Sequence, residues 1–499
     1  MTRRGARDPA WRPGRATIPV SALLLGMVAA PLSGQQVRAT GTTTVRFLQL
    51  RPLEVDSVPV VETRGEGLLR RSQDGQVVRC VEGETFCRFL ASSDAVEAAP
   101  VLQDVRLSVW GLGRGVRAYG HLRGRGVAGN GGDVWPMSGD HFDALAAWVE
   151  VERSLFRVRA GRQWKTSGLG YHNFDGVSVR VRALETLTVE AWGGRSLLRG
   201  TTEPRTGDLL AAVEPFAPDE GEILVGAEAS WRPGPGQAVS ALYQREIRRD
   251  RAGLYAERMT VDGLWRAGRW TLTGTIEADL GTGTFNEARL DASLRAGGRW
   301  GTAVFARRHR PFFEAWTIWG AFAPVGFDEV GGRGWWRPGS VPMTVETRAA
   351  WRRYGDAHAS TTFETYRDSG WRLSAAATLA PSPAWQMQLT LGTDVGFGAS
   401  RDDATFRIQR TLGDRTRLAA SAMAFERVYE FRVDEGTVWG AGVDGGVRIS
   451  PEVTVDGRLA GYLHRTPDGL PQRDWSQLRG SLTVRWTVGA EPGATGGAP

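Results

Sequence analysis

The feature that most constrains the fold is strict two-residue alternation of apolar and polar side chains over long segments. In RWTLTGTIEADLGTGTFNEARLDASLRAGGRW (269–300), a Gly-Thr-Gly break separates two such segments. Successive side chains of a β-strand point to opposite faces, so each segment predicts a strand with one apolar and one polar face. The first apolar row is Trp270, Leu272, Gly274, Ile276, Ala278 and Leu280, and the second is Ala288, Leu290, Ala292 and Leu294.

The length of these segments selects among β folds. Strands of soluble proteins usually run about five or six residues. A tilted strand that crosses the hydrocarbon core of a membrane needs about ten residues. The segments in this chain are long enough for the second case, and they predict a transmembrane barrel rather than a sandwich.

Short breaks and longer connections alternate along the chain. The short breaks are rich in Gly, Pro, Asp and Ser, which supply the backbone angles of hairpin turns. Short turns at one end and long loops at the other are typical of outer-membrane barrels. We therefore expect an all-β, antiparallel transmembrane β-barrel of about 18–22 strands, with long extracellular loops and short periplasmic turns. The short breaks are 232–237, 266–269, 295–299, 337–340, 380–384, 412–416 and 450–452, and the longer connections are 125–141, 165–174, 196–220, 310–327, 354–369 and 466–474.

Residues 1–35 have the pattern of a secretory signal peptide, with an uncleaved N-terminal anchor as the alternative. A basic stretch precedes the continuous apolar run 16–32, which ends in small residues. The segment carries five Arg and one Asp, so its removal lowers the formal charge from +7 to +3 (7 − 4). The remaining basic and acidic residues are nearly matched and interspersed, which argues against a nucleic-acid partner.

The segment TTTVRFLQLRPLEV (42–55) is the expected first strand. Segments counted from residue 103 give about twenty-one strands, and bacterial single-chain barrels have an even number. One more strand restores an even count, and the barrel then spans 42–489 with a flexible tail at 490–499. Residues 53–101 become an insert that serves as an extracellular lid or plug. A periplasmic subdomain beside a barrel of about twenty strands is the alternative.

The two cysteines, Cys80 and Cys87, predict a disulfide in this insert. They lie in VVRCVEGETFCRF, where a Glu-Gly turn brings the two sulfurs face to face across a short hairpin. Closing so short a loop constrains the unfolded chain by roughly 2–3 kcal/mol. A metal site is the alternative, but no His lies nearby in the sequence.

The stretch LFRVRAGRQWKTSGLGYHNFDGVSVRVR (155–182) combines two alternating strands, the triplet Gly161-Arg162-Gln163, a Gly-rich loop and Phe174-Asp175-Gly176. This pattern resembles the alginate-export type of outer-membrane porin and related porin-like barrels. The resemblance covers about thirty residues. It implies a channel whose pore is lined by Arg and acidic side chains, and it implies no particular solute.

Charged side chains at lumen-facing positions are the candidate pore lining. Clusters of one sign in a narrow pore shift ion selectivity. The alternative is that these charges pair across the wall. The expected pore-lining residues are Arg157, Arg159, Arg180, Arg182, Glu277, Asp279, Glu287, Arg289 and Asp291.

The aromatic-rich connection 307–330 holds two candidate ligand contacts, Trp316 and Trp319. Folded into the mouth, these rings could hold a sugar or an apolar ligand face. At the rim they would belong to the aromatic belt.

No motif predicts catalysis. The six histidines are scattered and belong to no nucleophile pattern, so we expect no enzyme and no cofactor, with a rim hydrolase as the alternative. The expected function is an outer-membrane channel that passes small polar or anionic solutes by passive diffusion. A closed barrel with an adhesion or scaffold role is the competing hypothesis. The expected partners are outer-membrane lipid, lipopolysaccharide, small polar solutes and the barrel-assembly machinery.

Overall fold

A computed structural model describes most of the chain between residues 35 and 489. The described residues are 35–50, 53–73, 77–92, 95–129, 142–197, 223–248, 253–310, 326–355, 367–397, 399–430, 436–465 and 474–489. The expected signal peptide (except residue 35), the expected tail, and the two candidate ligand residues Trp316 and Trp319 lie outside these ranges. No helix within the described ranges is long and apolar enough to span a membrane.

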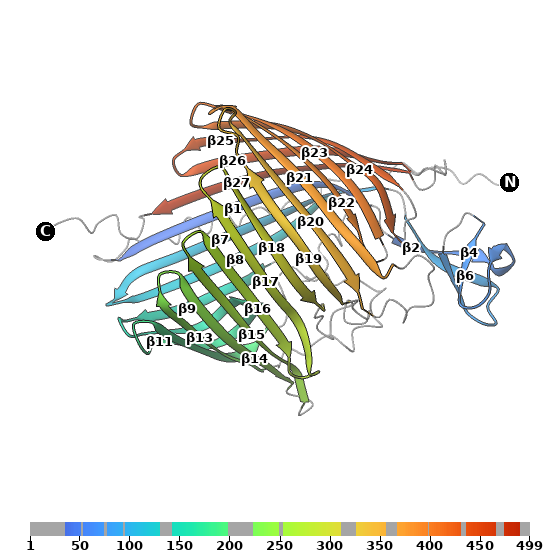
Figure 1. Cartoon of the computed structure of the whole chain (residues 1–499). Coiled ribbons are helices and arrows are strands. Elements are labelled where there is room, and N and C mark those ends of the chain that lie inside the picture. The colour runs from blue at the N-terminus through green and yellow to red at the C-terminus, as the bar shows by residue number, and fades with distance from the viewer. Residues whose placement is uncertain are drawn as a thin grey trace.

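The main body is a closed antiparallel barrel of 22 strands, which confirms the all-β barrel expected from the alternation (Figure 1). Each strand pairs with its neighbours along the chain, except that β1 pairs with both β7 and β27 and so closes the ring. The strands are β1 (Gln36–Leu50), β7 (Val96–Gly113), β8 (Val116–Gly129), β9 (Phe142–Glu152), β10 (Phe156–Ser167), β11 (Gly170–Arg182), β12 (Leu187–Ser196), β13 (Ile223–Gly234), β14 (Gln237–Arg248), β15 (Gly253–Ala267), β16 (Trp270–Asp279), β17 (Thr284–Ala296), β18 (Trp300–His309), β19 (Phe327–Trp336), β20 (Met343–Tyr354), β21 (Ser369–Ser382), β22 (Trp385–Val395), β23 (Ala399–Leu412), β24 (Thr416–Glu430), β25 (Thr437–Ser450), β26 (Val453–Arg465) and β27 (Trp475–Gly489).

The two ends of the barrel differ, and we name them by their connections. At the turn end, β1 begins, β27 ends, and short turns join β7 to β8 and every later pair on that side. Most of the longer connections, such as the one between β12 and β13, join strands that meet at the opposite end, the loop end. The connection between β1 and β7 also lies at the loop end, and it carries a second sheet.

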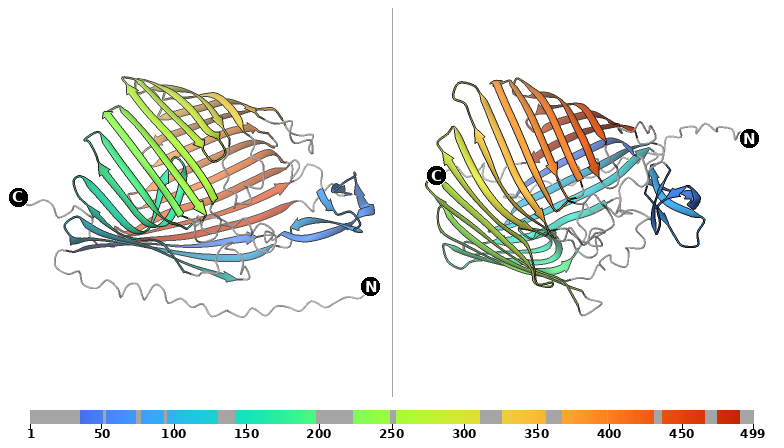
Figure 2. Two further views of the ribbon diagram at one scale, coloured as in Figure 1. Left: turned by 90° about the horizontal axis from the view of Figure 1, so that it is seen from below. Right: turned by 45° about the vertical axis from the view of Figure 1, so that its right-hand side comes forward.

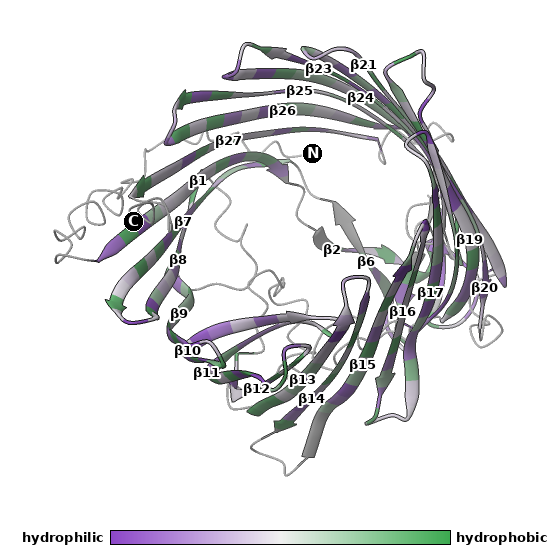
Figure 3. Ribbon diagram, turned by 60° about the vertical axis from the view of Figure 1, so that its left-hand side comes forward, coloured by the Kyte–Doolittle hydropathy of each residue, from purple (hydrophilic) through white to green (hydrophobic). Residues whose placement is uncertain are grey.

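This second sheet is a small five-stranded unit with the order β2-β6-β5-β4-β3. Its elements are β2 (Leu53–Pro59), the 3-10 turn η1 (Val60–Glu62), β3 (Thr63–Arg64), β4 (Leu69–Ser72), β5 (Val77–Cys80) and β6 (Phe86–Ser92). Figure 2 shows it beyond the loop end in two views, and Figure 3 shows β2 and β6 inside the outline of the ring. The small sheet therefore lies over the loop-end opening.

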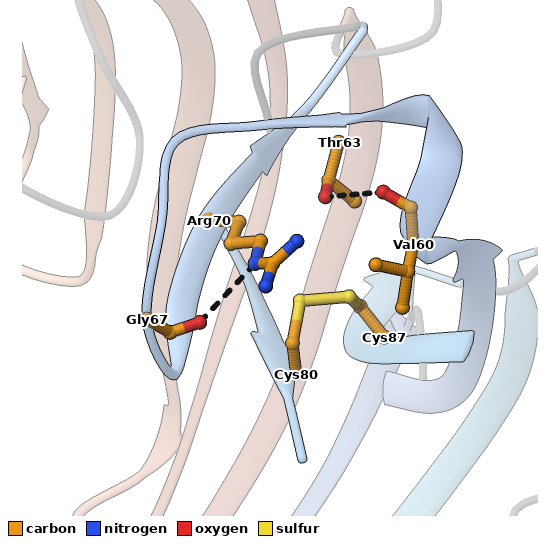
Figure 4. The surroundings of a disulfide bond; sticks show 6 residues. All are labelled: Val60, Thr63, Gly67, Arg70, Cys80 and Cys87. Atoms are coloured by element: carbon orange, nitrogen blue, oxygen red, sulfur yellow. Dashed lines mark hydrogen bonds between the residues drawn. A yellow bond between two sulfur atoms is a disulfide. The ribbon is translucent and has the colours of Figure 1, made fainter. Parts of the chain in front are cut away.

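The disulfide expected between Cys80 and Cys87 joins β5 to β6 (Figure 4). The two residues are directly opposite in the register, with Cα atoms 4.2 Å apart. Both are buried with Val78, and the side chains of Val58, Val60 and Phe89 pack against them. The disulfide and these apolar side chains form the core of the small sheet.

The first strand and the insert differ from the expected boundaries. Strand β1 begins at Gln36 rather than at residue 42, and residues 53–55 belong to β2 of the small sheet. Residues 96–101, expected in the insert, are the start of barrel strand β7. Alternation alone did not locate the break, because β1 and β2 follow each other with only residues 51–52 between them.

The alternation gives the wall one apolar and one polar face, and side-chain burial shows which of the two faces the lumen. On β17, Leu290 is 52% exposed while its neighbour Asp291 is 4% exposed. On β19, Val330 is 55% exposed and Glu329 is 4% exposed. Interior side chains of a closed barrel shield one another, so the polar face lines the lumen and the apolar face is the outer surface. Figure 3 shows the resulting alternation of hydrophobic and hydrophilic residues along the strands.

Exposed tryptophans of the outer face gather near both ends of the strands. Near the turn end they are Trp231, Trp265, Trp270, Trp300 and Trp336, and toward the loop end they are Trp351, Trp371 and Trp439. An apolar outer band between two aromatic girdles is the surface that a bilayer requires of a barrel.

Candidate functional site

The β10–β11 hairpin folds inward and lies against the lumen face of the wall. Its tip, Ser167–Gly170, contacts residues of β14 and β15 rather than continuing along the barrel. Arg258 Nη1 donates a hydrogen bond to the Leu169 carbonyl oxygen at 2.9 Å. Beside it, the Gln244 amide lies 3.0 Å from His172 Nε2, and His172 Nδ1 lies 3.2 Å from Glu246 Oε1. The hairpin thus occupies part of the lumen, and we name it the inward hairpin.

A buried apolar cluster holds the inward hairpin on the wall. Leu169 and Phe174 of the hairpin pack with Trp192, Leu224 and Leu242, and all five side chains are almost fully buried. Leu224 and Leu242 are unusual because they are large apolar residues at lumen-facing positions of β13 and β14. Burying a side chain of this size contributes about 1.5–3 kcal/mol, so the cluster stabilises the inward position.

Glycines make the inward bend possible. Gly161 has φ +121°, and a Cβ at this position would lie 2.2 Å from the Ala147 carbonyl oxygen. At the tip, Gly170 has φ +112°, and a Cβ on Gly168 would lie 3.0 Å from Thr260 Cγ2. Only a residue without a Cβ fits such positions without strain, so the Gly-rich character of this segment has a steric reason. Residues 165–174 were expected to be a loop, but β10 and β11 run as paired strands up to the tip.

Charged side chains at the base of the inward hairpin form a network around Glu150 of β9. The Glu150 side chain is fully buried and accepts hydrogen bonds from Arg117 Nε and from Arg159 Nη2, both at 2.6 Å. Arg157 Nε is more distant, 3.8 Å from Glu150 Oε2. One buried carboxylate therefore lies among three guanidinium groups, which leaves a local excess of positive charge.

A second network joins both strands of the hairpin to the wall strands β12 and β13. Lys165 Nζ is 3.1 Å from Glu190 Oε2 and 2.7 Å from Glu228 Oε2. Arg180 Nη2 also donates to Glu190 Oε2 at 2.6 Å. The two networks face a cavity of about 230 Å³ that Arg157, Arg159, Lys165, Arg180 and Glu190 line. We name this the hairpin cavity. Its four cations still outnumber Glu190 together with Glu150 and Glu228, which contact them, and this excess suits the anionic group of a small solute.

The expected pore-lining residues farther around the wall are paired. Arg258 contacts Glu277. Glu287 is 2.6 Å from Arg307 Nε and from His309 Nδ1. Asp291 is 3.1 Å from Arg333 Nη2 and 3.7 Å from Arg289 Nη2. The wall between β15 and β19 is thus a polar surface in which each of these carboxylates is neutralised by a cation.

Two expected pore-lining residues have other positions. Asp279 is buried, and its Oδ1 accepts hydrogen bonds from the backbone N–H groups of Gly281 and Thr282, so it shapes the turn after β16. Arg182 ends β11, opposite Thr188 near the turn end, and it is exposed. The structure therefore brings Arg157, Arg159 and Arg180 together at the hairpin cavity but places Arg182 apart from it.

A larger cavity of about 860 Å³ lies on the lumen side of β15–β22. Its charged lining includes Arg266, Arg295, Arg333 and Arg348, with Glu346 as the carboxylate. Trp335 adds an aromatic face, and Arg337 stacks on that ring at 5.1 Å. The lumen therefore has a second region in which guanidinium groups outnumber carboxylates.

Several residues of the site were missed by sequence reasoning. Glu150, Glu190 and Glu228 lie on strands that no motif marks. The register places Glu150 opposite Arg159 and Glu190 opposite Glu228, and the inward position of the hairpin brings Lys165 to the latter two. Lys165 is the only lysine of the chain, which is the one signal that could have identified it. Within the described residues, no three His, Cys, Asp or Glu side chains gather in a way that could hold a metal ion.

Comparison with known proteins gives structural neighbours but no sequence relative. No family model and no curated protein matches the sequence. A BenF-like porin from Pseudomonas fluorescens aligns at 10% identity over 92% of this chain and 100% of that chain, with a TM-score of 0.40. The outer-membrane protein OpdK from Pseudomonas aeruginosa aligns at 11% identity over 92% and 100%, with a TM-score of 0.36.

A third structural neighbour is a protein with a different role. The translocation pore of the P pilus usher PapC aligns at 9% identity over 91% of this chain and 100% of that chain, with a TM-score of 0.43. A likeness at this level is shared by porins and by a usher pore, so it does not select a solute. The alginate-export type, which residues 155–182 resemble, is not among these three structures and stays a prediction.

Proposed function

We propose that the protein is a channel of the bacterial outer membrane that passes small polar or anionic solutes by passive diffusion. The observation that supports this most directly is the division of the wall into an apolar outer face with aromatic girdles and a charged lumen face. An apolar outer band excludes water in the way that a membrane-facing surface must. A charged interior would be costly to bury in a sealed core but is well suited to hydrated solutes.

The preference for anions rests on the cavities of the lumen. Both the hairpin cavity and the cavity lined by Arg266, Arg295, Arg333 and Arg348 hold more cations than carboxylates. The inward hairpin occupies part of the lumen and so limits the size of the solute. Electrostatic attraction in a confined, partly desolvated passage raises the local concentration of counter-ions.

The proposed orientation places the turn end in the periplasm and the loop end outside the cell. The start of β1 and the end of β27 both lie at the turn end, because the number of strands is even. In bacterial barrels with an even number of strands both termini are periplasmic. The small sheet then lies on the extracellular side, as expected for a lid or plug, and not in the periplasm. The signal peptide, the alginate-export relationship, and the roles of lipopolysaccharide and the barrel-assembly machinery belong to this proposal as well.

Planar-bilayer recording of the refolded chain from residue 36 onward tests the proposal. We expect discrete conductance steps and, across a salt gradient, a reversal potential of the sign that marks anion preference. Absence of conductance, in protein whose heat-dependent gel migration shows a folded barrel, would favour the closed scaffold. Replacing residues 53–92 by a short Gly-Ser linker then tells whether the small sheet obstructs the opening.

A further inference from the structure

A row of charges interrupts the outer face of the barrel near the loop end. In the register, Asp328 of β19 is directly opposite Arg308 of β18 on one side and Arg353 of β20 on the other. The Arg308 and Asp328 side chains are 75% and 63% exposed, and their ion pair is long, at 3.8 Å. All three residues point away from the lumen, because they alternate with the lumen-facing Arg307, Glu329 and Arg352.

These charges adjoin an apolar groove on the same outer face. The groove has a volume of about 710 Å³ and extends from β15 to β20. Two glycines leave the groove open at one side, since a Cβ on Gly263 would meet open space and one on Gly274 would make only ordinary contacts. Its apolar lining includes Val261, Ile276, Leu290, Ala306, Val330 and Trp351, while Arg308 and Asp328 close it toward the loop end.

We infer that this groove and its arginines bind one lipid of the outer leaflet, a phosphorylated and multiply acylated glycolipid with the chemistry of lipid A. An acyl chain lies in the groove, and a phosphate contacts Arg308 and Arg353. The inference rests on the proposed membrane location and orientation, because only then does the loop end reach the lipopolysaccharide leaflet.

Charge and exposure both favour a phosphate as the partner. Two arginines flank one aspartate, so the row has an excess of one positive charge. A long, exposed Arg–Asp pair is weak, and a phosphate with several acceptor oxygens forms stronger charge-assisted hydrogen bonds with guanidinium groups. Charged groups on the lipid face of a barrel are tolerated near the interface and costly at the midplane, which matches their place at the loop-end edge of the apolar band.

The outer face offers a matched control at its other end. Arg410 of β23 is also exposed and points outward, but it lies near the turn end and stacks on Trp385 at 5.1 Å. In the proposed orientation it faces the phospholipid leaflet. A substitution there removes one positive charge from the outer surface without touching the groove.

Binding of fluorescent lipid A to the purified full-length barrel in detergent tests the inference. The double variant Arg308→Gln/Arg353→Gln should bind about tenfold more weakly than the native chain. Arg308→Lys/Arg353→Lys should retain most of the affinity, and Arg410→Gln should retain all of it. Gly263→Leu, which fills the groove and leaves both arginines in place, should also weaken binding.

Comparing several lipids distinguishes lipid A from other lipids that carry a phosphate. Dephosphorylated lipid A should bind the native chain and the double Gln variant equally weakly. Equal affinity of the native chain for phosphatidylglycerol and lipid A would overturn the assignment to lipid A, and unchanged binding by the double Gln variant would overturn the site. Heat-dependent gel migration verifies folding, and the conductance of the same variants, expected to be native, keeps this test separate from that of the channel.

Discussion

The carbonyl oxygen of Leu169, at the tip of the inward hairpin, accepts a 2.9 Å hydrogen bond from the guanidinium group of Arg258 in β15. Arg258 also contacts Glu277 of the next strand. The hairpin tip is therefore joined through one arginine to two strands of the wall. Together with the buried apolar cluster around Leu169 and Phe174, this contact fixes how far the hairpin extends into the lumen.

We predict that Leu169→Ala loosens the inward hairpin. Removing a buried leucine costs about 2–5 kcal/mol, and the hydrogen bond to the backbone carbonyl is left in place. Single-channel recordings should show more frequent transitions to a larger conductance than the native chain shows. Leu155→Ala is the control, because Leu155 lies in the turn before β10 and is 64% exposed. Native recordings from Leu169→Ala would mean that the hairpin does not limit ion flow.

A second prediction concerns the charge of the hairpin cavity. Arg157→Gln should reduce anion preference, seen as a reversal potential closer to zero in a salt gradient, because Arg157 lies in this cavity. Its contact with Glu150 is long, at 3.8 Å, so folding should change little. Arg410→Gln, on the outer face, should leave the reversal potential unchanged. An equal effect of the two variants would show that net charge, rather than the cavity, sets selectivity.

The assignment of the two faces gives a third prediction. Ile276 is 53% exposed on the outer face, and an Arg there should cost about 2–4 kcal/mol at the bilayer midplane. Thr275 points into the lumen, where its hydroxyl donates a 2.7 Å hydrogen bond to Asp262 Oδ1. Thr275→Arg places a cation near the Asp262 carboxylate and should fold normally. Refolding yield into vesicles, measured by heat-dependent migration, compares the two, and equal yields would contradict the face assignment.

The alternation made the wall predictable from sequence, but it could not reveal the inward hairpin. Lumen-facing positions such as Arg157, Asp291 and Glu277 follow from parity alone, since a strand has only two faces. Parity says nothing about where a strand leaves the wall. That departure depends on Leu169 and Phe174 meeting Leu224 and Leu242, which are distant in sequence and meet only after the barrel closes.

The pairing of charges was unpredictable for a related reason. Whether Glu150 contacts Arg117 and Arg159 depends on the register of three strands, and a shift of two residues would keep every parity yet change every partner. Sequence reasoning therefore gave candidate residues without their pairs. The loop-like composition of 165–174 was also misleading, because its glycines serve a bend within paired strands.

Removal of the disulfide should destabilise the small sheet and spare the barrel. In Cys80→Ala/Cys87→Ala, the loss of a short cross-link costs the sheet about 2–3 kcal/mol. Limited proteolysis should cut between residues 53 and 92 faster than in the native chain, while heat-dependent migration of the barrel stays native. Treating the native chain with a reductant should reproduce this pattern. Equal cleavage rates would mean that the buried Val78 and its neighbours suffice to hold the sheet.

The side of the membrane on which the small sheet lies gives the last prediction. An epitope inserted at Asp74-Gly75, between β4 and β5, should bind antibody on intact cells, because β1 delivers the chain to the loop end. The control is the same epitope at Gly298, in the short turn between β17 and β18, where a Cβ would meet open space. That epitope should bind only after the outer membrane is permeabilised. If the two epitopes exchange their behaviour, the barrel is inserted with the loop end in the periplasm. If neither binds on intact cells, the small sheet is not exposed at the cell surface, and the proposed extracellular position is wrong.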